Sequence, residues 1–525
     1  MTAGRPSTST VSSTVPVNVL PTMDSCRSTV PAGTRPSAAR ASLLEQLSYE
    51  CYLTDQVAQA RDSALDALAI YDQERDALSI GRSQRWLSRL CWLPGQNADS
   101  ERYAAAAVTA LEPLGPGREL AMAYSNLAQL RMLAGDTAEA IRWGAKAIEL
   151  ARRLGDREAE THALNNVGTA LSRAGDVAGG RARLAQSLDL ALADDAHEHA
   201  ARAYANLGSI GAGSRSFREA GRQLQAGIAY CTDRDLDTWR LYMSAWLAHS
   251  LAGQGQYAAA GQHLAAIMRH PHLSPVTRVS ALPVAGVLAA RRGSDGTSQL
   301  DQALPIALQT GGPQRLVPVA AARAEAAWIT GRAPDIAAEI DRAWPVAVAH
   351  PRPWDRGELS WWLRLAGDDR RIPAPVAEPF ALMLTGRQRA AAGEWRDLGC
   401  PLWAACALAF SAETRDAQQC LDILGHLGAP AVRPAVLRAR HAQGLTVPRG
   451  PRPASRANPA GLTAREVEVL QLLADGLSCA EIAGRLILSE KTAGHHIPAI
   501  LRKLGEPTRA RAVAAAVRLG IIPPR

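Results

Sequence analysis

Small and hydrophobic residues recur along this chain with a period of 40 residues. The segments AYSNLA from Ala123, ALNNVG from Ala163 and AYANLG from Ala203 align without a gap. Between such segments, apolar residues keep the 3.6-residue spacing of amphipathic helices. Gly-Asp pairs such as Gly135-Asp136 separate the helices, because glycine accepts the left-handed conformation after a helix and aspartate caps the next one. The pattern predicts an all-α fold built from antiparallel helix pairs.

The repeated helix pairs are expected to stack, because one pair alone cannot bury its apolar face. They resemble tetratricopeptide arrays, whose usual period of about 34 residues is shorter. We expect this α-solenoid to span residues 41–444, although prolines disturb the register after about His270. Residues 1–40 are rich in Ser, Thr and Pro, a composition that predicts disorder. Residues 445–460 are dense in Pro, Gly and Arg and predict an extended basic linker before a compact unit at residues 461–525.

Residues 461–525 carry four helix-start signals. TARE from Thr463 and SCAE from Ser478 have the spacing of capping boxes, and Ser489 and Thr508 have the position of further N-caps. A tight turn at Ile487-Leu488 separates the second helix from a longer, basic third helix. This order predicts a helix-turn-helix arrangement within a four-helix domain.

The predicted third helix has one apolar and one polar face. Its apolar side, expected to face the core, comprises Ala493, Ile497, Ile500, Leu501 and Leu504. The opposite side and its flanks comprise Lys491, Thr492, His495, His496, Pro498, Ala499, Arg502 and Lys503. Such a helix can lie in the major groove, with its outer face against base edges and its flanks against phosphates. The backbone amides that follow Ser489 offer a further phosphate site.

The segment LTAREVEVLQLLADGLSCAEIAGRLILSEKTAGHHIPAILRKLG resembles the LuxR-type helix-turn-helix domain of bacterial transcription regulators. With the repeats, the chain resembles the large LuxR subgroup in which an N-terminal ATPase and a tetratricopeptide-like sensor precede this domain. The resemblance implies backbone contacts by Lys491, Thr492 and His496, and base contacts at the positions of Gly494, His495 and Pro498. It also implies that two chains pair on DNA through the fourth helix. We therefore predict a DNA-binding site composed of Ser489, Lys491, Thr492, Gly494, His495, His496, Arg502 and Lys503.

Two features depart from the LuxR pattern. Gly494 and Pro498 stand where many relatives have lysine or another polar residue. A proline inside a helix removes an amide hydrogen bond and clashes with the carbonyl four residues earlier, which costs about 3 kcal/mol. We expect the helix to kink at Gly494 and its affinity to depend mainly on phosphates. The family's ATPase module is not expected, because the chain has no G-x-x-x-x-G-K-[ST] phosphate loop.

The distribution of charge supports a polyanionic partner. The net charge is +8, and residues 433–525 contain fifteen basic but only six acidic residues, which leaves the rest of the chain near neutrality. A basic tail on a neutral body indicates contact with double-stranded DNA. No run of residues is long and apolar enough to span a membrane, and no secretion signal is evident, so we expect a cytoplasmic protein.

Other candidate chemistry in the chain is weaker. The segment DDAHEH from Asp194 has metal-capable side chains, but its spacing favours a solvated turn at a repeat junction. A ligand groove could be lined by Trp86, Trp92, Tyr124 and Trp143, although packing in the core is the more ordinary use. We find no arrangement typical of an enzyme or a cofactor site and expect neither. The prediction is a regulator whose repeats sense a protein or small ligand, and the alternative is a solenoid scaffold with a degenerate tail.

Overall fold

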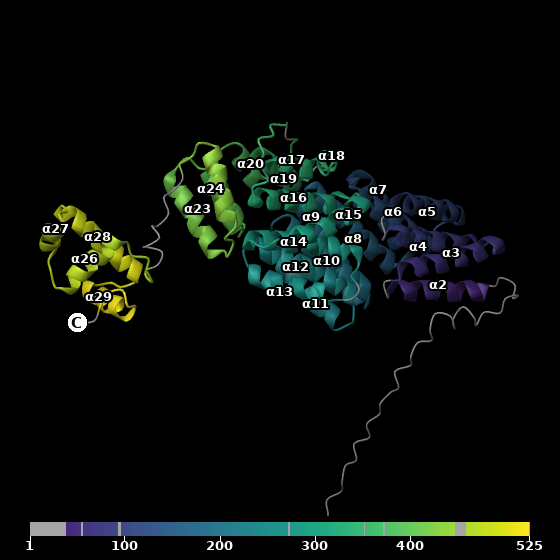
Figure 1. Cartoon of the computed structure of the whole chain (residues 1–525). Helices are drawn as coiled ribbons and strands as arrows, with labels where there is room; N and C mark the ends of the chain where they lie inside the picture. Colours follow the sequence, from purple (N-terminus) through teal and green to yellow (C-terminus); the bar gives the residue numbers. More distant parts are fainter. Residues whose placement is uncertain are drawn as a thin grey trace, which may run out of the picture. The chain divides into compact units, whose positions relative to one another are not determined.

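The computed structural model describes residues 38–53, 56–92, 96–270, 273–350, 352–370, 373–446 and 458–523. In these ranges the regular structure is helical, which confirms the predicted all-α fold (Figure 1). The chain divides into two compact units, Met1–Gly444 and Leu445–Arg525. Of the residues predicted to be disordered, 1–40, residues 1–37 fall outside the described ranges, whereas residues 38–40 are helical. Most of the predicted linker, residues 447–457, also falls outside the described ranges.

The first unit consists of successive helix pairs. They are α2 (Ala38–Leu53) with α3 (Val57–Glu74), α4 (Ala77–Trp92) with α5 (Asn97–Leu111), α6 (Arg118–Ala134) with α7 (Thr137–Leu154), α8 (Arg157–Ala174) with α9 (Val177–Ala193), α10 (His197–Gly213) with α11 (Phe217–Thr232), α12 (Asp237–Gly253) with α13 (Tyr257–Met268), α14 (Pro275–Arg292) with α15 (Thr297–Thr310) and α16 (Pro313–Thr330) with α17 (Ala333–Asp341). A short 3-10 helix, η1 (Glu112–Leu114), follows α5. Shorter helices complete the unit: α18 (Trp344–Ala349), α19 (Pro353–Leu365), α20 (Glu378–Leu384), α21 (Gln388–Asp397), α22 (Pro401–Ala409), α23 (Thr414–His426) and α24 (Val432–Ala442).

The two helices of each pair occupy different layers. First helices contact the first helices of neighbouring pairs, as in the series α6, α8, α10, α12, α14 and α16. They are also the more deeply buried: most residues of α8 are buried, whereas α9 buries only a few. The first helices therefore form an inner layer and the second helices an outer one, which is the arrangement expected when each hairpin needs its neighbours to cover its apolar face.

The junctions between helices follow the predicted chemistry. Gly135 has φ 83°, and the Asp136 carboxylate accepts a hydrogen bond from the Glu139 amide at 3.2 Å. The Glu139 carboxylate pairs with Arg142 on the same helix. The series of helix pairs continues beyond His270, but α12, α14 and α16 begin 38 residues apart instead of 40, so the repeat register shifts there. Pro275 and Pro313 each occupy a first-turn position, where a proline removes no hydrogen bond that the helix needs.

Small residues set the spacing within a hairpin. A Cβ added to Gly180 of α9 would lie 2.5 Å from the Gly168 carbonyl oxygen and 2.7 Å from the Ser172 amide nitrogen of α8. Neither contact is sterically possible, so the backbones of α8 and α9 can approach this closely only with glycine. This supports the prediction that small residues at matching repeat positions allow close packing.

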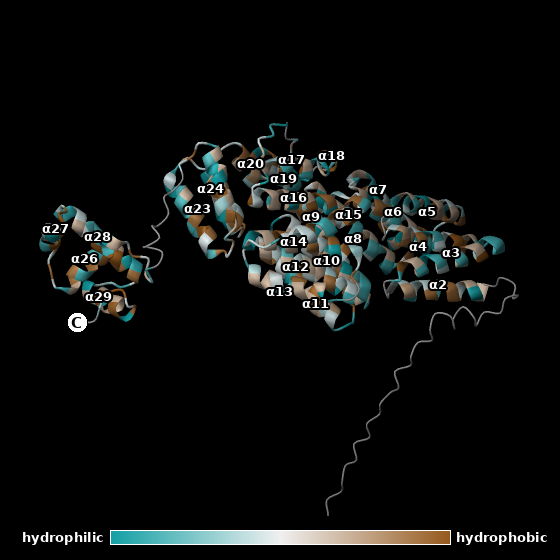
Figure 2. Cartoon of the chain, in the orientation of Figure 1, coloured by the Kyte–Doolittle hydropathy of each residue, from teal (hydrophilic) through white to brown (hydrophobic). Residues whose placement is uncertain are grey.

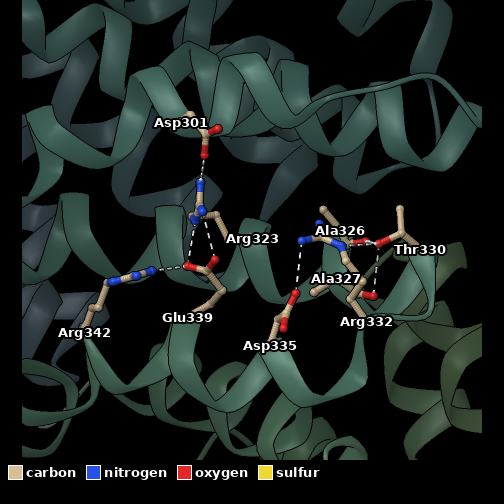
Figure 3. A network of polar contacts seen from close by, with 9 residues as sticks. All are labelled: Asp301, Arg323, Ala326, Ala327, Thr330, Arg332, Asp335, Glu339 and Arg342. Carbon is tan, nitrogen blue, oxygen red and sulfur yellow. Dashed lines mark hydrogen bonds and ion pairs between the residues drawn. The ribbon is translucent and has the colours of Figure 1, made fainter.

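Ion pairs connect neighbouring helices in the later repeats. Arg323 of α16 forms a bidentate pair with Glu339 of α17, at 2.7 and 2.8 Å, and also donates to Asp301 of α15 (Figure 3). Arg342 donates to the same Glu339 carboxylate. Two planar hydrogen bonds fix the guanidinium orientation, so Arg323 joins three helices of two neighbouring pairs.

Hydrophobic and hydrophilic residues are interleaved along the helices of both units (Figure 2). Within the described ranges, no helix is both long enough and apolar enough to cross a membrane. The apolar residues are instead buried between helices, as amphipathic periodicity requires.

The described part of the second unit contains four helices: α26 (Ala464–Ala474), α27 (Cys479–Leu486), α28 (Glu490–Leu504) and α29 (Arg509–Arg518). Thr463 and Ser478 form the two predicted capping boxes, and Thr508 caps α29. Helix α28 packs against each of the other three helices. The buried core comprises Leu462, Val469, Leu470, Ile482, Ala483, Ala493, Ile497, Ile500, Ala516 and Ile522.

Candidate nucleic-acid interface

The N-terminus of α28 is fixed by Ser489. Its hydroxyl accepts a hydrogen bond from the Thr492 amide at 3.1 Å and lies 2.7 Å from the Thr492 hydroxyl. Two residues earlier, Ile487 adopts a left-handed conformation that ends α27 and reverses the chain. Short helix, tight turn and capped second helix thus form the predicted helix-turn-helix.

The two faces of α28 are those that the sequence pattern predicts. Ala493, Ile497 and Ile500 are buried, and Leu501 and Leu504 pack against the core from its edge. On the other side, the exposed residues are Lys491, Thr492, His495, Pro498 and Arg502, while Gly494 and His496 are half-buried. The helix therefore presents a polar face to solvent, interrupted at Gly494 and Pro498.

Charge on this unit is compensated unevenly. Arg511 and Arg518 both pair with Glu506, and Arg465 pairs with Glu468. Within the described part of the chain, no ion-pair partner lies beside Lys491 or Arg502, nor beside Arg485, which is exposed in the last turn of α27. Uncompensated positive charge thus lies on α28, on the end of α27 and on Arg509 at the start of α29, which donates to the Cys479 sulfur.

Arg485 was not among the residues predicted from sequence. Glu481 lies four residues before it on α27, a spacing that suggests an ion pair. The Glu481 carboxylate instead accepts a hydrogen bond from the Ser478 amide at 2.7 Å to complete the capping box. The capping box could therefore have identified Arg485 from the sequence. It engages Glu481, the only acidic residue on α27 with which Arg485 could pair.

Comparison with known proteins identifies this unit. The protein family described as "Bacterial regulatory proteins, luxR family" matches residues 460–516. The tetratricopeptide-repeat family matches residues 119–191 of the repeat unit. The spore germination protein GerE of Bacillus subtilis is 44% identical over 59 residues, which are 11% of this chain and 80% of GerE. The chain belongs to the LuxR family of bacterial regulatory proteins. Both resemblances stated from sequence, LuxR-type and tetratricopeptide-like, are confirmed.

The LuxR relatives share only the tail. The transcriptional regulatory protein YxjL of Bacillus subtilis is 45% identical over 60 residues, which are 11% of this chain and 28% of YxjL. This chain therefore spans little more than a quarter of YxjL. Among solved structures, a Rap protein complexed with competence and sporulation factor has a TM-score of 0.45 and 11% identity, covering 62% of this chain and all of that protein.

Lys503 differs from the other predicted contacts of the LuxR-type unit. Its ammonium donates to the Glu466 carboxylate at 2.6 Å and to the Gly461 carbonyl at 3.1 Å. Burial of Glu466 opposes its ionisation, yet hydrogen bonds from Lys503 and the Thr463 amide hold the pKa of this carboxyl below its ordinary value. The charge of Lys503 is therefore already compensated, and its bond to Glu466 ties α28 to the start of α26.

Pro498 lies inside α28, which runs without interruption from Glu490 to Leu504. The proline has no amide hydrogen to donate to the carbonyl of Gly494, four residues earlier. Gly494 has open space where a Cβ would be. Neither residue is held there by packing, so both weaken the helix that the LuxR-type unit exposes.

Ile487 is a second strained position. It adopts φ 53° and ψ 50° and is 93% exposed. A β-branched residue in the left-handed region is a steric outlier, and no burial offsets its cost. Sequence reasoning placed the turn at this position but did not reveal that isoleucine would be strained in it.

Proposed function

We propose that this protein regulates transcription in the cytoplasm by binding operator DNA, with α28 in the major groove and the repeat unit receiving a protein or small-ligand signal. The observation that carries the proposal is the outward face of a capped, anchored helix that holds cations without internal partners. Cations of this kind bind DNA phosphates favourably, because each contact releases condensed counterions from the DNA.

The predicted residues take different parts in this proposal. Lys491, Thr492, His496 and Arg502 contact the backbone, and His495 lies against base edges beside Gly494, whose small size allows close approach. The Ser489 hydroxyl is already used by the cap, so Ser489 orients the amides of the first turn toward a phosphate. Lys503 acts as a positioning residue through Glu466. Two copies pair through α29, which places two α28 helices on a two-fold operator.

A salt titration tests the proposal. Binding of residues 445–525 to labelled duplexes is followed by fluorescence anisotropy from dilute to physiological salt. Lys491→Ala and Arg502→Ala are each expected to weaken binding on every sequence and to reduce the slope of log K against log salt by about 0.9.

Arg465→Ala is the matched control, because Arg465 lies on α26, outside α28 and the proposed pairing helix, and already pairs with Glu468 at 2.6 Å. It should leave the slope unchanged. Equal effects of all three substitutions would show that binding is diffuse and does not use α28. Binding without any preferred sequence would instead favour the solenoid scaffold with a degenerate tail.

A further inference from the structure

The inner layer of the repeat unit encloses a cavity of about 1450 Å³. Its walls come from first helices, among them α4, α8, α10 and α16. Pockets for small ligands typically measure about 300–1,000 Å³, so this cavity accommodates a ligand larger than a simple metabolite.

One wall of the cavity holds a buried arginine without an acidic partner. Arg202 is 6% exposed, and one end of its guanidinium donates to the Asn166 side-chain oxygen. Among the described residues, its Nη1 atom has no hydrogen-bond partner. The nearby carboxylate of Glu198 is engaged by Arg89, whose Nη2 donates to it at 2.6 Å. Burial, and then repulsion from Arg89, lower the pKa of Arg202 to about 9.

A second set of cations lines the same cavity. Arg315 is 7% exposed, and its guanidinium lies 4.9 Å from the centre of the Trp92 ring. Arg173 donates to the Met132 carbonyl at 3.4 Å and to its sulfur at 3.1 Å. The described residues provide neither arginine with a carboxylate. Burial, and then repulsion from Arg352, lower the pKa of Arg173 to about 10.

The acidic residues around the cavity do not neutralise these arginines. Asp194 is exposed and pairs with Arg157 at 2.6 Å, and Asp237 pairs with Arg240 at 2.8 Å. Asp355 lies 3.0 Å from Arg352. A buried cation without a partner costs several kcal/mol. Buried Arg202 and Arg315, with half-buried Arg173 beside the same cavity, therefore call for an anion from outside the chain.

We infer that this cavity binds an organic ligand with two separated oxyanion groups, carboxylate or phosphate, one beside Arg202 and the other beside Arg173 and Arg315. Aromatic side chains also line the cavity, so the ligand carries apolar or aromatic parts as well. Among them are Tyr52, Trp92, Tyr242, Trp246 and Trp354. This inference names the ligand class for the signal-receiving unit and rests on the function proposed above.

Two probes distinguish the sources of the oxyanions. The first is a hexapeptide with glutamates near both ends and a central tryptophan, compared with the same peptide carrying glutamines and an amidated C-terminus. The second is NADP⁺, compared with NAD⁺, which lacks the 2′-phosphate. Each is titrated into the full chain, and the thermal midpoint and calorimetric affinity are measured. One of the two anionic probes is expected to raise the midpoint, and its less charged counterpart to bind more weakly.

Arg202→Gln and Arg315→Gln are each expected to weaken binding of the effective probe by at least about thirtyfold, because each removes one partner of a buried charge pair. Arg153→Gln, at an exposed position on α7, is the control and should leave the affinity unchanged. Neither substitution in the cavity removes an internal ion pair, and each removes a buried cation that lacks a carboxylate partner, so the unliganded midpoint should not fall.

Failure of both anionic probes to bind would overturn the inference. So would equal binding of the charged and neutral counterparts, or unchanged affinity in both cavity variants. The assay contains no DNA, so a negative result would concern the cavity alone. Operator binding by the tail is tested separately, by the salt titration described above.

Discussion

Replacing Pro498 by alanine should stabilise the LuxR-type unit. The proline is exposed, so its removal loses little packing, and the new amide can donate to the Gly494 carbonyl within a helix that already continues to Leu504. Proline is less favourable than alanine in a helix interior by about 3 kcal/mol. Some of this strain is relieved by adjustment at Gly494, so we expect a gain of about 2–3 kcal/mol.

Urea denaturation of residues 445–525, followed by circular dichroism, measures this gain. For a domain of this size the same change corresponds to a rise in melting temperature of roughly 10–20 °C. Gly494→Ala, in the same turn of α28, serves as a comparison: its expected gain in the free energy of unfolding is about 1 kcal/mol. An unchanged or lower midpoint in Pro498→Ala would refute the reasoning, because it would mean that the native helix carries no cost at this position. Pro498→Ser should also raise operator affinity, since an intact helix holds its contacts in place.

Three other substitutions test separate parts of the structure. Gly180→Ala should lower the thermal midpoint of the full chain by an amount equivalent to about 1–3 kcal/mol through overpacking, whereas Gly221→Ala, with open space around it, should not. Ile487→Gly should stabilise the tail in urea by about 0.5–1 kcal/mol, since it relieves a left-handed β-branched residue but adds freedom to the unfolded chain. Glu466→Gln should cost about 1–2 kcal/mol at neutral pH. Because the folded-state pKa of Glu466 is lowered, its stabilisation is present above the ordinary carboxyl pKa and lost as pH falls; acid titration of Glu466→Gln should show a smaller loss than the unaltered tail.

The fold was largely predictable because the repeat appears in the sequence itself. A fixed 40-residue spacing of small residues, with Gly135-Asp136 at a helix junction, determines both the helix pairs and their stacking. The register beyond His270 was harder to predict, since the prolines looked like interruptions. Pro275 and Pro313 are instead first-turn residues, and whether a proline starts or breaks a helix depends on neighbours that periodicity does not reveal.

The interface on α28 was predictable in its faces but not in its charges. Spacing alone separates Ile497 from His495, but only the structure shows that Lys503 is held by Glu466 while Arg485 has no acid beside it. These outcomes depend on side chains from other helices or on a cap, so they cannot be derived from one helix.

The cavity was the least predictable part. The segment from Asp194 was expected to be a solvated turn, but Glu198 lies in the first turn of α10 and pairs with Arg89, which is distant in sequence. For several aromatic residues the sequence left open whether they line a ligand groove or pack in the core. Trp92 lines the cavity, whereas Tyr124 and Trp143 pack on each other with ring centres 5.4 Å apart. Helix periodicity cannot separate these cases, because a concave inner surface and a core are both apolar.

Selection of bound duplexes from a random-sequence library tests the central claim most directly. The full chain is incubated with the library near physiological salt, and the bound fraction is sequenced after successive rounds. The account predicts enrichment of one motif with two related half-sites, and loss of its base preference in His495→Ala. A bound fraction with the same sequence composition as the starting library would contradict the claim that α28 recognises operator DNA.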